Sequence, residues 1–254
     1  MCLILFSLDR HPTYKLVIAA NRDEFFDRKT SEAHFWKDAP DIVGGRDLEA
    51  HGTWMAMTRA GRISMVTNYR DPANIRADAP SRGKLVTDYL LSAKNPREFL
   101  EDLRPGAASY NGFNLLVGNP EELWYLSNYQ DGIHPVTKGV HGLSNHLLET
   151  PWPKVTRGKE QLSTLLTQDS IDPESLFEML YDEMPAMENQ LPDTGIGRER
   201  ERALSSMFIK TPGYGTRCST VVLVTHGNDV TYAERVYDLS TYAHSLQSFK
   251  FTIG

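Results

Sequence analysis

Two apolar runs joined by a short polar link open the chain, and this pattern constrains the fold more than any other feature. Cys2–Leu8 is apolar except for one serine, and Tyr14–Ala20 is a second, largely apolar run. Runs of this length are typical of buried strands. The link through Asp9–Pro12 is too short for the crossover that parallel strands require. The two runs therefore predict an antiparallel hairpin.

Three further strand pairs, with turn residues between their members, follow the same pattern. They are Trp54–Thr58 with Ile63–Thr67, Phe113–Gly118 with Leu123–Ser127, and Thr216–Thr225 with Val230–Tyr237. Helical patterns fall between these pairs, at Gly83–Ser92 (with Ser81 as its N-cap), Pro96–Leu103, a long segment opened by Pro151, and Pro173–Tyr181. Grouped hairpins and grouped helices predict an α+β fold with mainly antiparallel sheets.

The composition indicates one soluble domain over residues 1–254. Apolar residues make up 40% of 254, with no repeat or linker, and the net charge of −6 argues against a nucleic-acid partner. The first apolar run is shorter than the roughly 20 residues of a membrane span and has no basic leader, so we expect neither stable membrane insertion nor a secretory signal. Only Cys2 and Cys218 occur, which favours a reducing, cytoplasmic location.

Several kinds of site have no sequence signature. The chain contains no phosphate-binding or dinucleotide-binding glycine loop, and Ser144 lacks the second glycine of a hydrolase elbow. Its eight histidines are scattered, so we expect no metal and no resident cofactor. His141 and His146 are interpreted as surface or hydrogen-bonded side chains. Three methionines are interpreted as core residues: Met179, Met184 and Met187.

Cys2 directly follows the initiator methionine. Aminopeptidases usually remove Met1 before so small a residue, which would leave a thiol and a free α-amine on Cys2. An α-amine titrates at about 7.7–8.0 in model peptides, so it can act as the base for its own side chain. Taken alone, Cys2 is also well explained as a small buried apolar residue.

Polar groups stand at the ends of four predicted strands, where they could surround such a thiol. These groups are Asn21–Glu24, Thr67–Arg70, Gly142–His146 and Gly215–Cys218. Each has a structural explanation of its own: Asn21 as the cap of a following helical turn, Asn145 as a turn residue, Arg217 as an ion pair. Together, four polar strand ends favour a shared site.

In order along the chain, these motifs resemble the NRDE family, also called the transport and Golgi organisation protein 2 family. The resemblance covers nearly the whole chain and rests on Met1–Ile4, Asn21–Glu24, Gly52–Trp54, Thr67–Arg70, Leu143–Asn145, Pro151–Lys154 and Arg217–Thr220. That family is distantly similar to N-terminal nucleophile hydrolases such as choloylglycine hydrolase and penicillin V acylase. The resemblance implies a four-layer αββα sandwich and cleavage of linear amide bonds.

The resemblance also assigns roles to individual residues. The catalytic group it implies is Cys2 as nucleophile, Asp23, Asn145 as an oxyanion donor and Arg217 near the thiol. The substrate-binding group is Asn21, Arg22, Glu24 and Asn68. In the hydrolases an arginine and an aspartate are separated by two residues, whereas Arg22 and Asp23 are adjacent. Either Asp23 or Glu24 is therefore expected to hold the α-amine.

Two classes of function follow from these expectations. In the first, the protein is an amidohydrolase whose small-molecule partner is an acyl amide. In the second, the same scaffold binds haem or a lipid without cleaving it. The first requires a free α-amine on Cys2, so the presence or removal of Met1 is the most informative single observation. The sequence specifies no oligomeric state.

Overall fold

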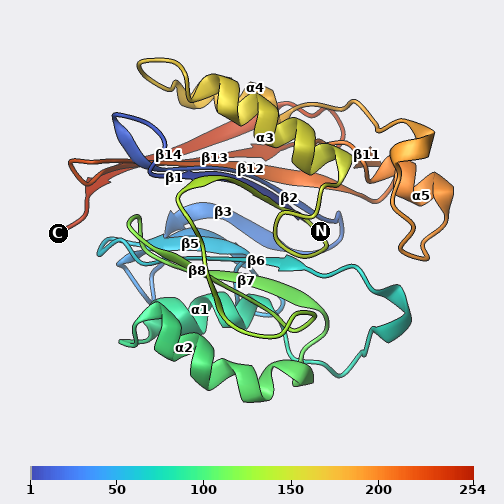
Figure 1. The fold of residues 1–254 in the computed structure, drawn as a ribbon, viewed down its shortest axis with the longest axis horizontal. Helices are drawn as coiled ribbons and strands as arrows, with labels where there is room; N and C mark the ends of the chain where they lie inside the picture. Colours follow the sequence, from blue (N-terminus) through green and yellow to red (C-terminus); the bar gives the residue numbers. More distant parts are fainter. Residues whose placement is uncertain (1) are drawn as a thin grey trace.

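Two antiparallel sheets packed face to face form the centre of the computed structural model, which describes residues 2–254 (Figure 1). The first sheet has the order β10-β1-β2-β12-β13-β14, with β11 paired to β12. Its strands are β1 (Cys2–Leu8), β2 (Tyr14–Phe25), β10 (Gly139–Leu143), β11 (Lys210–Thr211), β12 (Tyr214–Thr225), β13 (Asp229–Tyr237) and β14 (His244–Thr252). The second sheet runs in chain order through β3 (Thr30–Phe35), β4 (Ile42–Asp47), β5 (Met55–Thr58), β6 (Ile63–Asn68), β7 (Phe113–Gly118), β8 (Leu123–Ser127) and β9 (His134–Pro135).

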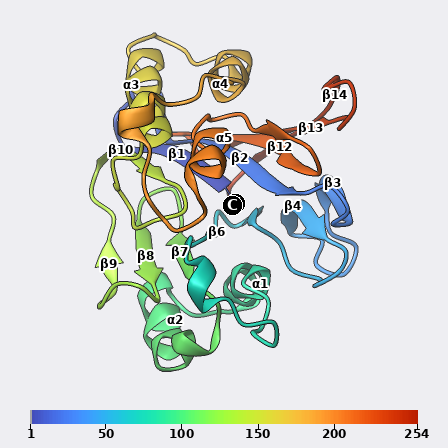
Figure 2. The ribbon, with the colours of Figure 1, turned by 90° about the vertical axis from the view of Figure 1, so that its right-hand side faces the viewer.

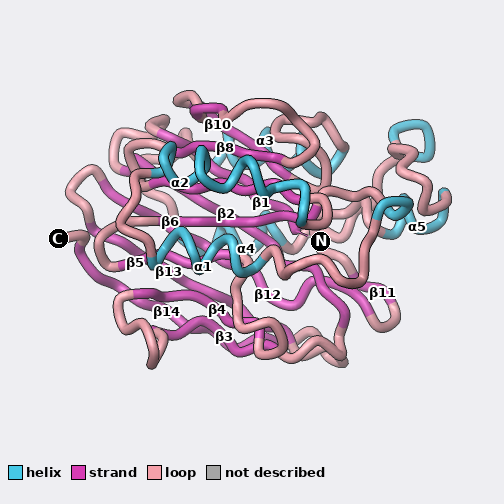
Figure 3. Tube along the Cα trace, turned by 90° about the horizontal axis from the view of Figure 1, so that it is seen from below, coloured by secondary structure: helices cyan, strands magenta, loops and turns pink. Residues whose placement is uncertain are grey.

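Helices cover the outer face of each sheet. The α-helices are α1 (Gly83–Leu91), α2 (Pro96–Leu103), α3 (Pro153–Leu165), α4 (Pro173–Leu180) and the short α5 (Arg198–Ala203). Figure 2 shows α3 and α4 on the first sheet and α1 and α2 on the opposite side of the molecule. Seen from below, α1 and α2 lie over the second sheet (Figure 3). This arrangement confirms the expected αββα sandwich.

Strand β1 shows why the opening run is apolar at almost every position. Side chains alternate between the two faces of a strand. Ile4 and Phe6 point into the core between the sheets, while Leu3 and Leu5 pack in the core beneath α3 and α4. Because both faces are covered, neither set can be polar, and β1 is an internal strand with β2 and β10 on either side.

The structure differs from the sequence-based expectations at the end of β2 and at the start of α1. Strand β2 continues to Phe25 because it stays paired with β12, so Asn21–Glu24 lies within the strand and no helical turn follows Asn21. Helix α1 has Arg82 as its N-cap, without a side-chain cap bond, so the Ser81 cap was wrong. The strand end expected at Gly142–His146 is that of β10, whereas strands β3, β4, β9, β11 and β14 were not predicted. None of the helices formed by residues 2–254 is long and apolar enough to cross a membrane.

Candidate functional site

Strand register places Cys2 beside Arg22. Cys2 is the first residue of β1 and pairs directly with Arg22 of β2, which pairs with Cys218 of β12. Directly paired residues point to the same face of a sheet, and Ile4, two residues along, packs between the sheets. Cys2 and Arg22 therefore lie on the face that meets the second sheet.

A pocket of about 280 Å³ opens beside Cys2. Its lining includes a thiol, charged side chains, an amide and an aromatic ring, from Cys2, Arg22, Asp23, Glu24, Trp54, Asn68 and Arg82. A larger cavity of about 440 Å³ lies between α4 and strands β12 to β14, but its lining contains no cysteine or histidine. The pocket beside Cys2 combines a cysteine thiol with charged groups, so it is the candidate site.

Two glycines bring separate parts of the chain to this pocket. A Cβ atom on Gly52 would lie 2.5 Å from the backbone carbon of Gly83, closer than side-chain carbons approach. The Thr53 N–H donates to the Gly83 carbonyl at 3.2 Å. This tight contact joins the segment carrying Trp54 to the loop carrying Arg82.

Arg22 is the cation nearest the thiol along the backbone register, and only 5% of it is exposed. Its guanidinium carbon lies 4.2 Å from the centre of the Trp54 ring, a stacking arrangement that stabilises a buried cation. Nη2 lies 3.8 Å from Glu24 Oε2. Nη1 is buried and has no hydrogen-bond partner among residues 2–254.

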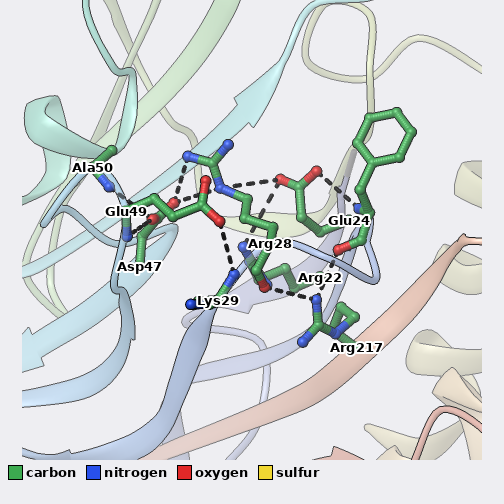
Figure 4. Close-up of polar contacts among 9 residues, drawn as sticks. Arg22, Glu24, Arg28, Lys29, Asp47, Glu49, Ala50 and Arg217 are labelled. Atoms are coloured by element: carbon green, nitrogen blue, oxygen red, sulfur yellow. Dashed lines mark hydrogen bonds and ion pairs between the residues drawn. The ribbon is translucent and has the colours of Figure 1, made fainter.

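Glu24 and Arg28 extend the charged network (Figure 4). Glu24 Oε2 lies 4.0 Å from Arg28 Nε, and Arg28 Nη2 lies 2.6 Å from Asp47 Oδ2. Burial acts to raise the pKa of Glu24, but the Phe25 N–H and the two guanidinium groups hold that pKa below its ordinary value. Glu24 is therefore an anion at neutral pH.

Asp23 points to the other face of β2, toward the helical layer. It is 1% exposed, and its Oδ1 accepts a hydrogen bond from Thr216 Oγ1 at 2.7 Å. Burial raises the pKa of this carboxyl, while the nearby Lys154 cation opposes the rise. Lys154 is itself 1% exposed, and burial lowers the pKa of its amine to about 8. Each of these two buried groups thus favours the charged form of the other, although Lys154 Nζ has no hydrogen-bond partner within residues 2–254.

Burial also raises the pKa of the Cys2 thiol. The Asp23 carboxylate adds to this rise, whereas the Arg22 guanidinium and the Asp23 backbone N–H favour the thiolate. The thiol form is therefore the resting state. A nucleophilic role for Cys2 requires a base that removes its proton during the reaction.

The two asparagines have different places. Asn145 is fully buried, and its Nδ2 donates to the Asn68 carbonyl at 2.9 Å. The neighbouring Ser144 hydroxyl donates to the Cys2 carbonyl at 3.2 Å. Asn145 does not line the pocket, whereas Asn68 does. In the described part of the chain, no group hydrogen-bonds to the side-chain amide of Asn68.

Asn21 and Arg217 also lie outside the pocket lining. The Asn21 amide faces the helical layer and donates to the carbonyls of Leu180 and Met207, both at 2.9 Å. Arg217 sits at a bulge in β12 and donates to the carbonyls of Phe25 and Arg28 at 2.8 and 3.0 Å (Figure 4). Asn21 holds helix to sheet, and Arg217 fixes the turn that carries Arg28.

The structure adds three residues to which the sequence assigned no role: Trp54, Arg82 and Lys154. Trp54 ends the Gly52–Trp54 motif and Lys154 ends the Pro151–Lys154 motif, so both belong to motifs that carry the family resemblance. Arg82 carried no signal, because its segment reads as an ordinary helix start.

The histidines and methionines that the structure describes form no cluster of metal or haem ligands. His141 contacts Glu149 and the Thr137 carbonyl, and His146 contacts Tyr69 and Thr150. Within residues 2–254, no group of three or more His, Cys, Asp or Glu side chains is arranged to hold a metal ion. Met179 is buried as expected, but Met184 and Met187 are 63% and 62% exposed, so their assignment to the core was wrong.

Comparison with known proteins gives both a family and a fold. The model of the family described as Transport and Golgi organisation 2 matches residues 1–239. The human Transport and Golgi organization protein 2 homolog is 35% identical over 277 residues, covering 98% of this chain and all of that protein. The Drosophila melanogaster Transport and Golgi organization protein 2 is 30% identical over 259 residues, covering 92% and 91%.

Among solved structures, the C2A mutant of the conjugated bile acid hydrolase from Clostridium perfringens is similar across the whole chain. It is 9% identical with a TM-score of 0.50, covering 100% of this chain and 98% of that one. At this identity the likeness concerns the fold, which is that of the N-terminal nucleophile hydrolases.

Proposed function

The chain belongs to the Transport and Golgi organisation 2 family, and from that premise we propose that it is an amidohydrolase with Cys2 as its nucleophile. The substrate class is a small acylated amine with a linear C–N bond. One observation carries the proposal: Cys2 begins an internal strand and lines a pocket together with Arg22, Glu24 and Asn68. This combination supplies a thiol, a cation and an amide donor in one place.

The reaction requires Cys2 to be the first residue. Met1 lies outside the residues that the structure describes. With Met1 removed, the Cys2 α-amine takes the thiol proton and the sulfur forms a bond to the amide carbonyl carbon. The C–N bond then breaks as the protonated amine passes its proton to the departing nitrogen, leaving a thioester on Cys2. Water, deprotonated by the same amine, attacks the thioester and releases a carboxylic acid and the free thiol.

The surroundings of Cys2 are suited to these steps. Because burial raises the pKa of the thiol, the reaction needs a general base that removes the thiol proton as the sulfur attacks. The cation of Arg22 favours the thiolate once it forms. The Asp23 backbone N–H favours the thiolate, and we assign the orientation of the α-amine to the Asp23 carboxyl, because Asp23 follows Arg22, the residue paired with Cys2.

The oxyanion of the tetrahedral intermediate needs neutral N–H donors. We assign this role to the Asn68 side chain, because it lines the pocket and its amide is not engaged elsewhere in residues 2–254. Asn145, which donates to the Asn68 carbonyl, then acts as a positioning residue. This division revises the expectation that Asn145 itself is the donor.

The test compares two forms of one protein: one prepared with Cys2 as its first residue, and one that retains Met1. Both are screened against N-acyl amino acids and penicillin V, with released amine as the readout. We expect turnover only in the form that begins with Cys2, because Met1 blocks the base. Equal activity in both forms would contradict the mechanism. No activity on any amide would favour the haem- or lipid-binding alternative, which a haem titration followed by absorption would then examine.

A further inference from the structure

Three arginines (Arg22, Arg28 and Arg82) and three carboxylates (Asp23, Glu24 and Asp47) line the pocket beside Cys2. Some of these charges are neutralised by nearby groups of opposite charge. Arg28 and Asp47 form a close pair at 2.6 to 2.7 Å. Asp23 turns its carboxyl to the opposite face of β2, where it accepts a hydrogen bond from Thr216 and its charge is opposed by the buried Lys154 cation. These three groups have partners of their own.

The remaining charges are Arg22, Arg82 and Glu24, and they do not balance. Two guanidinium groups face one carboxylate, which leaves one positive charge. Arg22 approaches Glu24 only to 3.8 Å and has a buried Nη1 without a hydrogen-bond partner in residues 2–254. Arg82 donates one hydrogen bond to the Gly112 carbonyl at 3.0 Å. Within the described chain, no carboxylate lies at ion-pair distance from Arg82.

The start of α1 adds to the positive potential on this side of the pocket. Arg82 is the N-cap of this nine-residue helix, and neither a side-chain cap nor an acidic residue is present in its first turn. The first backbone N–H groups of a helix carry a partial positive charge that favours an anion. The helix and the unpartnered Arg22 nitrogen are independent features that favour the same kind of ligand.

We propose that Arg22 and Arg82 bind a carboxylate carried by the substrate. That the bound molecule is a cleavable amide rests on the proposed function, whereas the binding of a carboxylate by these arginines does not depend on it. The planar fork of a guanidinium matches the two oxygens of a carboxylate. With the Cys2 α-amine in the neutral form that acts as the base, a single negative charge balances the one left over, whereas Glu24 would repel a dianion such as a phosphate monoester. The substrate is therefore an amide bearing one carboxylate, such as an N-acyl amino acid or the monoamide of a dicarboxylic acid.

Binding is measured by calorimetry on Cys2→Ala protein, which has no thiol and so binds without turnover. Two pairs of probes place the charge on either side of the amide. N-octanoylglycine is compared with N-octanoylglycinamide, and glutaric acid monohexylamide with its primary amide. We expect the carboxylate member of at least one pair to bind about tenfold more tightly, the usual effect of a charge-assisted hydrogen bond. Inorganic phosphate at the same concentration should not compete.

Substitution of the arginine locates the effect. Arg82→Gln should reduce the preference for the carboxylate to less than about threefold. The matched control is Arg59→Gln, since Arg59 stacks on Phe35, with its guanidinium carbon 3.9 Å from the ring centre, and does not line the pocket. The control should keep the full preference.

Equal affinity within both probe pairs would overturn the proposal, as would no binding of either carboxylate at about 1 mM. Competition by phosphate, or an unchanged preference in Arg82→Gln, would also overturn it. The probe comparison uses intact arginines, so a folding defect in Arg82→Gln cannot hide the answer. If the carboxylate is preferred but no amide is cleaved, the binding site stands and the proposed function fails. If an amide is cleaved but the carboxylate is not preferred, the proposed function is supported and the carboxylate-binding proposal fails.

Discussion

Cys2 pairs directly with Arg22 across β1 and β2, so the cation beside the thiol is fixed by backbone register. Slipping the register by one residue would turn each of these side chains to the other face of the sheet. That slip is opposed by the whole of β1, because Ile4 and Phe6 would leave the core between the sheets. The position of the Arg22 cation beside the thiol is therefore maintained as long as the sheet is folded.

Asn68 and Asn145 should respond differently to removal of their amides. Asn68→Ala should lower turnover roughly a hundred- to a thousandfold, the usual loss of one oxyanion donor, and change the free energy of unfolding by less than about 0.5 kcal/mol. Asn145→Ala should lower that free energy by about 1–3 kcal/mol, because a fully buried hydrogen bond is lost. Turnover and urea unfolding of both variants are the measurements. A large loss of turnover in Asn145→Ala alone, with stability unchanged, would make Asn145 the donor.

Gly52 should not tolerate a side chain. In Gly52→Ala the new methyl would meet the backbone of Gly83 at 2.5 Å, and backbone cannot move aside cheaply. We expect a loss of about 1–3 kcal/mol in unfolding free energy. Gly106→Ala is the control, because nothing lies within 4 Å of its Cβ position, and it should be neutral or slightly stabilising. Similar losses in both variants in urea would show that the Gly52–Gly83 contact is unimportant.

Glu234 joins the two sheets. It is fully buried, its Oε1 accepts a hydrogen bond from the Ala33 N–H at 2.6 Å, and its Oε2 accepts one from Thr220 at 3.2 Å. Burial raises the pKa of this carboxyl from 4.5 to about 7. The folded protein therefore binds this proton more tightly than the unfolded chain does, and stability due to the group falls as pH rises from 4.5 through 7.

The prediction compares the wild type with Glu234→Gln, which stays neutral at every pH. Between pH 5 and pH 8 the wild type should lose about 2 kcal/mol of unfolding free energy relative to the variant. Urea unfolding at the two pH values measures this difference, and the variant cancels the contribution of all other groups. A constant difference between the two proteins across this range would show that Glu234 does not titrate as described.

The sequence predicted the architecture because its strongest signals are local. Apolar runs with short links determine hairpins, and the helices at Pro96–Leu103 and Pro173–Leu180 begin at proline after a capping residue. Strands β3 and β14 were missed because neither has a continuous apolar run: β3 is mostly half-buried, and β14 is mostly exposed. Their pairing depends on neighbours distant in sequence.

The candidate site was predicted in part. Arg22, Asp23, Glu24 and Asn68 do lie around the pocket with Cys2, since the last part of β2 pairs with the start of β1 and Asn68 ends β6. Asn21 points the other way because side chains alternate along β2, and the sequence treated it as following the strand. Arg82 could not be foreseen, because its place depends on the contact between Gly52 and Gly83.

The most direct test of the account is the turnover of one amide by two cysteine variants, each prepared with residue 2 at its start. Cys218→Ala is the matched control, because Cys218 is the other cysteine, is 4% exposed and pairs with Arg22 from the opposite side. We predict that Cys2→Ala falls below detection while Cys218→Ala stays within about threefold of the wild type, with both variants folded by circular dichroism. Turnover that survives in Cys2→Ala, or falls equally in both variants, would contradict a nucleophilic Cys2.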